Sequence, residues 1–345
     1  MGEAQKFQFQ TNFLRVGERS RSGDCICLRW GNDIDQGGTN QFVMVVDGGF
    51  ASNAAALSRQ IQNIIGDSKI DVLLSTHPHD DHIGGMTKFI DDFVVKKVVV
   101  RQPWKHSGIM KHFGGYDVSL SELSRREVLD RYGLGRAFDL VRRAKSVGCV
   151  VEEWDSGEDY DVCGTRISVL GPDVHAYDLL AKEFGMVSEE THVGDVSSDI
   201  IGDAESQDGN AENNSCYVLA FSFPEKTKKW ALLTSDVGSK SFDLVIKQIH
   251  DKGLRSDCLR LLQVPHHGSV RNVNEDQLDQ LVGTPDDAKE RPFGCAYAAV
   301  SVAGEPDLRH PHPLVVGWLK DRNMKVSTTR DGVYTYTLTV NLKAR

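Results

Sequence analysis

The sequence predicts an α/β protein in which two mixed β-sheets pack together and helices cover their outer faces. Short apolar runs that read as strands alternate with longer stretches whose apolar residues recur at helical spacing. These elements fall into two halves, and strands joined through helices in two halves suit two packed sheets. Hydrophobic residues make up 40% of the 345 residues, which is enough for a substantial core.

The expected elements follow from local composition and spacing. Runs rich in β-branched and apolar residues predict strands at residues 70–74, 98–100, 149–151, 167–170, 216–223, 230–234, 259–264, 325–328 and 333–340. Helical spacing of apolar residues predicts helices at residues 52–65, 120–147, 242–252 and 314–322.

We expect one domain over residues 1–345, with two insertions. The first covers about residues 104–148 and is helical. The second covers about residues 174–212 and ends in an acidic segment nearly free of large apolar side chains, which predicts an exposed loop. Because that loop leads into Asn213, a substrate-gating role and an inert surface loop both stay open.

The segment from His77 to His82 concentrates the residue types that bind metals. It holds three histidines and two aspartates in six positions, directly after an apolar run. A strand that ends abruptly there can aim imidazoles and a carboxylate into one small volume. Neutral imidazoles suit zinc, and a carboxylate adds the charge that holds a second ion. Three histidines so close together are hard to explain as ordinary surface residues, so the segment predicts a metal site.

This segment resembles the His-x-His-x-Asp-His signature of hydrolases with the metallo-β-lactamase fold. Further matches to that fold lie at residues 13–17 with 23–28, at 45–49 and at 232–236. Four further segments more specifically resemble the nuclease-like domain of the bacterial DNA-uptake protein ComEC and its free-standing relatives. These segments are residues 213–215, 264–269, 300–302 and 310–313. The resemblance implies an αββα metallo-β-lactamase sandwich with the active site at one edge.

The resemblance also implies two divalent metal ions, Zn²⁺ or Mn²⁺, that activate a hydroxide as the nucleophile. His77 and His79 would bind the first ion. Asp81 and His82 would bind the second, and Asp236 would bridge the two. Asp47, at a strand end, is expected to orient a ligand imidazole. The alternative for Asp47 is an aspartate that only starts a Gly-Gly turn.

The remaining ligands stay open. Many members of the fold supply a third histidine to the first metal where this chain has Asn213, so we expect an incomplete first site, or an amide or water there. His192 is an alternative. We expect His267 to bind the second metal and His266 to donate a proton to the leaving group, or the reverse. His310 is expected to contact substrate or to be the last ligand.

Three further residues are expected to bind substrate, and one histidine is expected to be structural. The substrate-binding residues are Asn214, Ser215 and Ser269, the last by donating to a phosphate oxygen. His312, between two prolines, is expected to begin the next helix. The expected catalytic residues are Asp81, His266 and His310.

Charge and composition bear on partners and location. The net charge of −9 argues against a long nucleic-acid duplex as partner. It does not exclude one, because two metal ions would supply a local positive field. No apolar run approaches the roughly 20 residues that cross a bilayer, and the N-terminus lacks an apolar signal region. Seven scattered cysteines without a Cys-x-x-Cys pair fit a reducing compartment. We therefore expect a cytoplasmic protein without membrane contact.

Three functions compete. The first is a metal-dependent phosphodiesterase or nuclease that acts on nucleic acid or a nucleotide. The second is a hydrolase of a small ester, thioester or lactam on the same metals, which the acidic charge favours slightly. The third is a non-catalytic relative that binds a metal or nucleotide, and the complete set of ligand types argues against it. The sequence favours the first.

Overall fold

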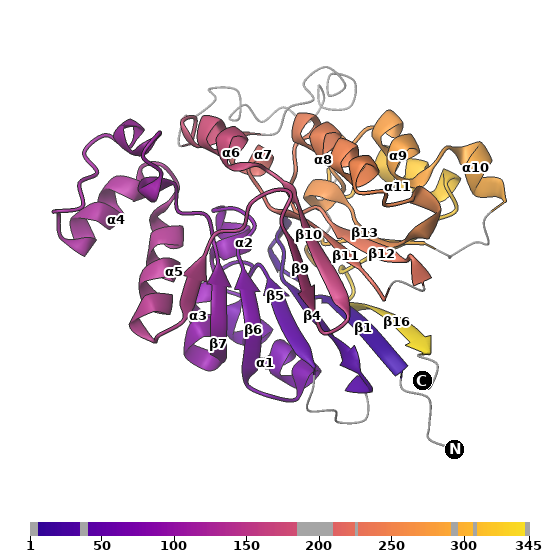
Figure 1. The fold of residues 1–345 in the computed structure, drawn as a ribbon, viewed down its shortest axis with the longest axis horizontal. Coiled ribbons are helices and arrows are strands. Elements are labelled where there is room, and N and C mark those ends of the chain that lie inside the picture. Colours follow the sequence, from indigo (N-terminus) through magenta and orange to yellow (C-terminus); the bar gives the residue numbers. More distant parts are fainter. Residues whose placement is uncertain are drawn as a thin grey trace.

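The structure, a computed structural model, describes residues 6–34, 41–184, 210–224, 227–290, 296–305 and 309–341. Two seven-stranded mixed sheets pack face to face, with helices on their outer faces (Figure 1). This confirms the predicted α/β sandwich. Among the described residues, no helix is long and apolar enough to cross a bilayer.

The first sheet has the order β16-β1-β4-β5-β6-β7-β8. Its strands are β1 (Lys6–Phe13), β4 (Ile26–Asn32), β5 (Phe42–Val46), β6 (Lys69–Leu74), β7 (Val94–Val99), β8 (Val150–Glu152) and β16 (Tyr334–Asn341). The pairs from β16 to β5 are antiparallel, and those from β5 to β8 are parallel. A small hairpin, β2 (Gly17–Glu18) and β3 (Arg21–Ser22), lies between β1 and β4 in the chain.

The second sheet repeats this plan with the order β15-β14-β13-β12-β11-β10-β9. Its strands are β9 (Asp159–Val162), β10 (Thr165–Gly171), β11 (Val218–Ser222), β12 (Trp230–Leu233), β13 (Leu259–Gln263), β14 (Tyr297–Val300) and β15 (Lys325–Thr328). The pairs from β9 to β12 are antiparallel, and those from β12 to β15 are parallel.

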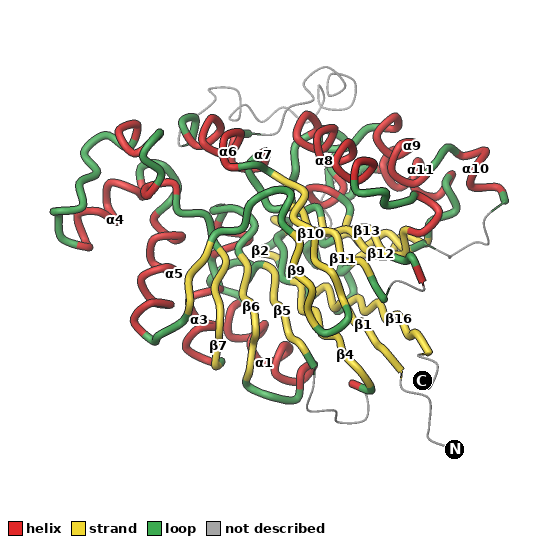
Figure 2. Tube along the Cα trace, viewed as in Figure 1, coloured by secondary structure: helices red, strands yellow, loops and turns green. Residues whose placement is uncertain are grey.

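Helices cover the outer face of each sheet (Figure 2). The larger helices on the first sheet are α1 (Ala54–Ile65), α3 (Met86–Asp92) and α5 (Gly135–Ser146), and those on the second are α8 (Ser239–Asp251), α9 (Glu275–Val282) and α11 (Pro313–Asp321). The others are α2 (Asp80–Ile83), α4 (Glu122–Asp130), α6 (Val174–Ala181), α7 (Ala211–Asn214) and α10 (Pro285–Lys289).

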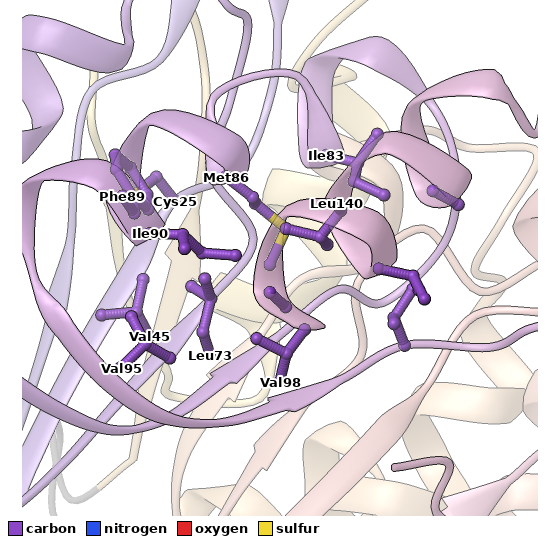
Figure 3. Close-up of a cluster of buried hydrophobic side chains, with 14 of the residues drawn as sticks. Cys25, Val45, Leu73, Ile83, Met86, Phe89, Ile90, Val95, Val98 and Leu140 are labelled. Carbon is purple, nitrogen blue, oxygen red and sulfur yellow. The ribbon is translucent and has the colours of Figure 1, made fainter. Parts of the chain in front are cut away.

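Three buried apolar clusters hold these layers together. One lies between the first sheet and its helices, where Met86 and Phe89 of α3 and Leu140 of α5 pack over Leu73 and Val98 (Figure 3). A second lies between the other sheet and its helices. The third fills the space between the sheets and includes several aromatic side chains. Each fully buried large apolar side chain contributes about 1.5–3 kcal/mol, so the sandwich is stabilised on both faces of both sheets.

Two expectations about elements differ from the structure. The helix predicted over residues 120–147 is two helices, α4 and α5, because the chain turns at Gly133, whose φ of 69° is left-handed. The segment that begins at residue 174 starts as a helix rather than a loop, since Asp173 caps α6 by accepting from two backbone N–H groups. Residues 185–209, which include His192 and most of the acidic segment, lie outside the described residues.

The parallel strands of both sheets end at one edge of the sandwich. Asp47 follows β5 and the His77 segment follows β6, while Asp236 follows β12 and His266 follows β13. Loops after the carboxyl ends of parallel strands converge, which is why such edges hold binding sites. The fold thus gathers four sequence-distant segments into one place.

The contact between two of these loops predicts a stability effect. A Cβ on Gly85 would overlap the carbonyl oxygen of Gly48 and would press on Ala54. We expect Gly85→Ala to lower the free energy of unfolding by about 1–3 kcal/mol, the usual cost of overpacking. Urea denaturation of the purified variants measures this change.

Gly317→Ala is the matched control. Gly317 lies inside α11, and a Cβ there meets nothing within 4 Å. Alanine in an open helix interior is expected to stabilise by roughly 0.5–1 kcal/mol. An unfolding midpoint for Gly85→Ala equal to that of the unsubstituted protein would show that the two loops do not pack as described.

Candidate metal centre

The first group of donors lies in the loop after β6. The loop ends in α2, whose N-cap is His79. The ring nitrogens His77 Nε2 and His79 Nδ1 are 3.0 Å apart, and the His77 and His82 ring centroids are 4.2 Å apart. Two ring nitrogens that close together either share a proton or bind one cation. The loop therefore brings three of the predicted ligand imidazoles together.

Asp47 orients two of these imidazoles. Its carboxylate accepts from His82 Nδ1 at 2.8 Å and from the Thr76 backbone N–H and hydroxyl at 2.8 and 2.7 Å. The single Thr76 hydroxyl proton goes to Asp47, so His77 Nδ1, 3.0 Å away, donates to the Thr76 oxygen. The hydrogen-bond network thus assigns tautomers in which His77 and His82 turn Nε2 toward the site.

Asp236 reaches the same place from the second sheet. It is 2% exposed. Its Oδ2 lies 3.4 Å from His82 Nε2, 3.6 Å from His266 Nε2 and 3.8 Å from His267 Nε2. Ligand atoms about 2.1 Å from one tetrahedral ion are roughly 3.4 Å from each other. The spacing around Asp236 is therefore that of donors grouped around cations.

The two adjacent histidines after β13 both point into the site. His266 and His267 have left-handed backbones, with φ of 45° and 55°, which is uncommon outside glycine. His267 Nδ1 donates to the Ser301 carbonyl at 3.0 Å, which turns its Nε2 to 3.9 Å from Asp81 Oδ2. His266 Nδ1 lies 3.2 Å from the Asn213 side-chain amide. The strained turn lets both neighbouring side chains reach Asp236.

Several sets of three side chains could each hold one ion, because their donor atoms all lie within 4.8 Å of one another. Among the described residues, these sets are His77, His82 and Asp236; Asp81, His82 and His267; Asp24, Asp47 and His82; and Asp24, Asp236 and His267. His79 and His266 fall outside these sets but lie next to them, beside His77 and Asp236.

The chemistry of these donor atoms also suits metal ions. Within the part of the chain that the structure describes, His82 Nε2, His267 Nε2 and Asp236 Oδ1 are buried without a hydrogen-bond partner. Buried polar atoms are nearly always satisfied, so three unsatisfied atoms on neighbouring side chains need an explanation. Imidazole nitrogens and carboxylate oxygens are what zinc and manganese bind. The residues present therefore fit a pair of divalent cations.

Burial and neighbouring charges set the protonation of these groups. Burial is the main cause that lowers the pKa of His77 and brings the pKa of His267 to about 4. Burial also disfavours the charged form of His82, but nearby carboxylates, Asp236 first, outweigh it and raise the pKa of His82. Burial also disfavours the charged form of Asp236, but the neighbouring imidazoles, His266 first, outweigh burial and lower the pKa of Asp236. Two neutral imidazoles and a carboxylate are ready to bind metal.

His310 and His312 separate in the structure. The His310 ring lies parallel to the His266 ring, with centroids 5.8 Å apart and an interplanar angle of 10°, and its centroid is 6.2 Å from that of His267. His312 caps α11 by accepting from the Leu314 N–H at 3.3 Å. His310 therefore stands beside the donor set, and His312 begins the helix as expected.

The predicted substrate-binding residues lie in the loops around the centre. The Asn214 side chain donates to a backbone carbonyl one turn earlier, at 3.2 Å. The Ser215 hydroxyl donates its only proton to the Glu212 carbonyl at 2.7 Å, whereas the Ser269 hydroxyl accepts from the Arg271 N–H at 3.2 Å. Among the described residues, no acceptor takes the proton of the Ser269 hydroxyl, whereas the Ser215 proton is already donated. Contact of these three residues with substrate stays a prediction.

The sequence reasoning did not single out Asp24 and Gln263. Asp24 is 1% exposed, and its Oδ2 accepts from Gln263 Nε2 at 2.8 Å and lies 3.9 Å from His82 Nδ1. Burial is the main cause that raises the pKa of Asp24 to about 7. One signal was present: an acidic residue stands between Gly23 and the apolar start of a buried strand.

One protein-family model matches part of the chain. A model of the Metallo-beta-lactamase superfamily matches residues 36–177, which include the whole His77–His82 segment. The matched range holds strands β5 to β8 of the first sheet and strands β9 and β10 of the second. The two packed mixed sheets with outer helices are consistent with the sandwich of the metallo-β-lactamase superfamily. A search of curated proteins finds none that matches the chain.

Several solved structures resemble the chain at low sequence identity. The metallo-β-lactamase fold protein YhfI from Bacillus subtilis is 9% identical, with a TM-score of 0.46 over 96% of this chain and 99% of that chain. A diphosphatase from the PhnP family is 12% identical, with a TM-score of 0.45 over 98% of this chain and 100% of that chain. A mutant metallo-β-lactamase from Cronobacter sakazakii is 12% identical, with a TM-score of 0.35 over 72% and 74%.

Proposed function

We propose that the protein is a dinuclear metal-dependent phosphodiesterase or nuclease of the ComEC-like kind. The observation that carries this proposal is the position of Asp236, whose Oδ2 lies 3.4 Å from His82 Nε2 and 3.6 Å from His266 Nε2. Asp236 also forms donor sets with His77 on one side and with His267 on the other. One carboxylate between two groups of imidazoles suits the bridge of a two-metal site.

The side chains divide the work in this proposal. His77 and His79 would hold the first ion, Asp81, His82 and His267 the second, and Asp236 both. Zn²⁺ or Mn²⁺ in these positions would supply Lewis acidity and would activate water at neutral pH. Asp47 and the Ser301 carbonyl keep the imidazole tautomers fixed through hydrogen bonds to ring nitrogens.

Two histidines beside Asp236, His266 and His310, favour a phosphodiester over a lactam as substrate. His266 is partly exposed and its ring is stacked against that of His310 beside Asp236. Imidazole N–H groups can hold phosphate oxygens, and one of them can give a proton to the departing oxygen. The Ser269 hydroxyl, in the turn after these histidines, has a proton to donate to a phosphate oxygen. A nucleic-acid or nucleotide substrate and a cytoplasmic location are parts of this proposal.

The test compares four substrates. Purified protein is assayed with added Mn²⁺ or Zn²⁺ on bis-p-nitrophenyl phosphate, single-stranded DNA, nitrocefin and a thioester. We expect metal-dependent hydrolysis of the first two, loss of activity with a chelator, and loss in Asp81→Ala. Turnover of nitrocefin or the thioester alone would move the function to the small-ester or lactam class. Bound metal without any turnover would favour a non-catalytic relative.

A further inference from the structure

A buried amide holds the strand end that carries Asp236. Gln263, the last residue of β13, accepts on Oε1 from the backbone N–H groups of Thr234 at 3.1 Å and Ser235 at 3.0 Å. Its Nε2 donates to Asp24 Oδ2 at 2.8 Å. Two backbone donors on one atom identify it as the oxygen, so the orientation of the amide is determined. Gln263 is 2% exposed and Asp24 1% exposed.

Ser235 connects the Gln263 amide, through hydrogen bonds, to the segments that carry the metal ligands. Its backbone φ of 49° is left-handed, a conformation that costs energy unless the surroundings hold it. Its hydroxyl donates to the Thr76 hydroxyl at 2.8 Å, and its carbonyl accepts from the His266 N–H at 3.0 Å. A shift of Ser235 would therefore disturb Thr76, which precedes the ligand His77, and His266, which precedes the ligand His267.

Asp24 is anchored on the first sheet. Its backbone N–H donates to the Asp81 carbonyl at 3.1 Å, and its own carbonyl accepts from the Gly49 N–H at 2.8 Å. One Asp24 oxygen also lies within 4.8 Å of the donor atoms of Asp236 and His267. The contact between Asp24 and Gln263 is thus a direct hydrogen bond between the loop of Asp81 and the strand end of Asp236.

We propose that Asp24 and Gln263 are positioning residues that set the distance between Asp81 and Asp236, and with it the affinity of the second ion. They act through the hydrogen bond between them and through the backbone groups that hold the segments of Asp81 and Asp236. Such partners behind the ligands typically change metal affinity about 10–100-fold when they are lost. The inference rests on the dinuclear centre of the proposed function and does not depend on the phosphodiester substrate.

A reciprocal exchange of amide and carboxylate tests the pair. In Asp24→Asn the acceptor for Gln263 loses its charge, and in Gln263→Glu two carboxylates face each other. In the double variant the new amide at position 24 can donate to the new carboxylate at position 263, which can still accept from Thr234 and Ser235. The exchange therefore restores the hydrogen bond with its direction reversed.

The readouts are titration of Mn²⁺ by calorimetry, for the affinity of each ion, and electron paramagnetic resonance, for spin coupling of the ion pair. We expect each single variant to lower the affinity for the second ion about 10–100-fold and to lose the spin coupling of the ion pair. The double variant is expected to recover most of both, because directly bonded residues have non-additive effects. Gln277→Glu is the matched control, since Gln277 is a buried amide bonded to Asp243 at 2.7 Å, and it should leave both readouts unchanged.

Other results overturn the inference. Unchanged second-ion affinity in both single variants, or additive losses in the double variant, would mean that the pair does not position the ligands. Failure of all three variants to fold, seen by thermal unfolding, would mean that the pair serves the fold instead. If the expected metal pattern appears but no phosphodiester is cleaved, the proposed function fails and the positioning pair stands.

Discussion

Replacing Asp236 by asparagine is expected to remove most binding of the metal pair and to lower phosphodiester hydrolysis roughly 10³-fold or more. The amide keeps the shape of the side chain but loses the charge that faces His82, His266 and His267 at 3.4–3.8 Å. Loss of one preorganised group that stabilises charge already costs about 10²–10³ in rate elsewhere. A ligand shared by two ions should cost more, because both ions lose their common anion.

Metal content by mass spectrometry and kcat/KM for bis-p-nitrophenyl phosphate measure this effect. The control is Asp251→Asn, an exposed aspartate at the end of α8, which should match the unsubstituted protein in both measurements. If Asp236→Asn keeps two ions per chain and normal turnover, Asp236 does not bridge the ions.

Asp47→Ala is expected to destabilise the protein and to weaken metal binding together. Its carboxylate is buried and accepts three hydrogen bonds, two from Thr76 and one from His82. Each buried donor left without a partner costs about 1–3 kcal/mol, so a loss of about 3 kcal/mol or more is expected. Asp47 also has a φ of 59°, where alanine adds roughly 1–2 kcal/mol of strain.

The second consequence concerns His82. Without the Asp47 acceptor, its ring is no longer fixed with Nε2 toward Asp236, and metal affinity is expected to fall about 10–100-fold. Urea denaturation and calorimetric Zn²⁺ titration measure the two effects. Asp47→Asn serves as the control for backbone strain, since asparagine tolerates the left-handed conformation. An alanine variant as stable and as tightly metal-bound as the unsubstituted protein would leave Asp47 as an ordinary turn residue.

The sequence predicted the parts of the fold that local pattern determines. The His77–His82 segment was recognisable because its donors lie on one loop at the end of a strand of apolar residues, Ile70 and Val72 among them. Most strands were recognisable by the same kind of run. The single helix predicted over residues 120–147 was wrong because apolar spacing continues across the left-handed turn at Gly133.

The rest depends on contacts between distant segments. Asp24 and Gln263 are 239 residues apart and meet only because two sheets pack together. The same holds for Asn213 and His266, whose side chains are 3.2 Å apart. No local spacing encodes such pairs, so the supporting residues around a predicted ligand set become visible only in the structure.

The most direct test of the account is a crystal structure of protein soaked with Zn²⁺ or Mn²⁺, with anomalous scattering measured at the absorption edge of the metal. Two anomalous peaks are expected about 3.5–4 Å apart. Asp236 should touch both peaks, His77 and His79 one, and Asp81, His82 and His267 the other. No peak among these side chains, or a single ion beyond the reach of Asp236, would contradict the dinuclear centre.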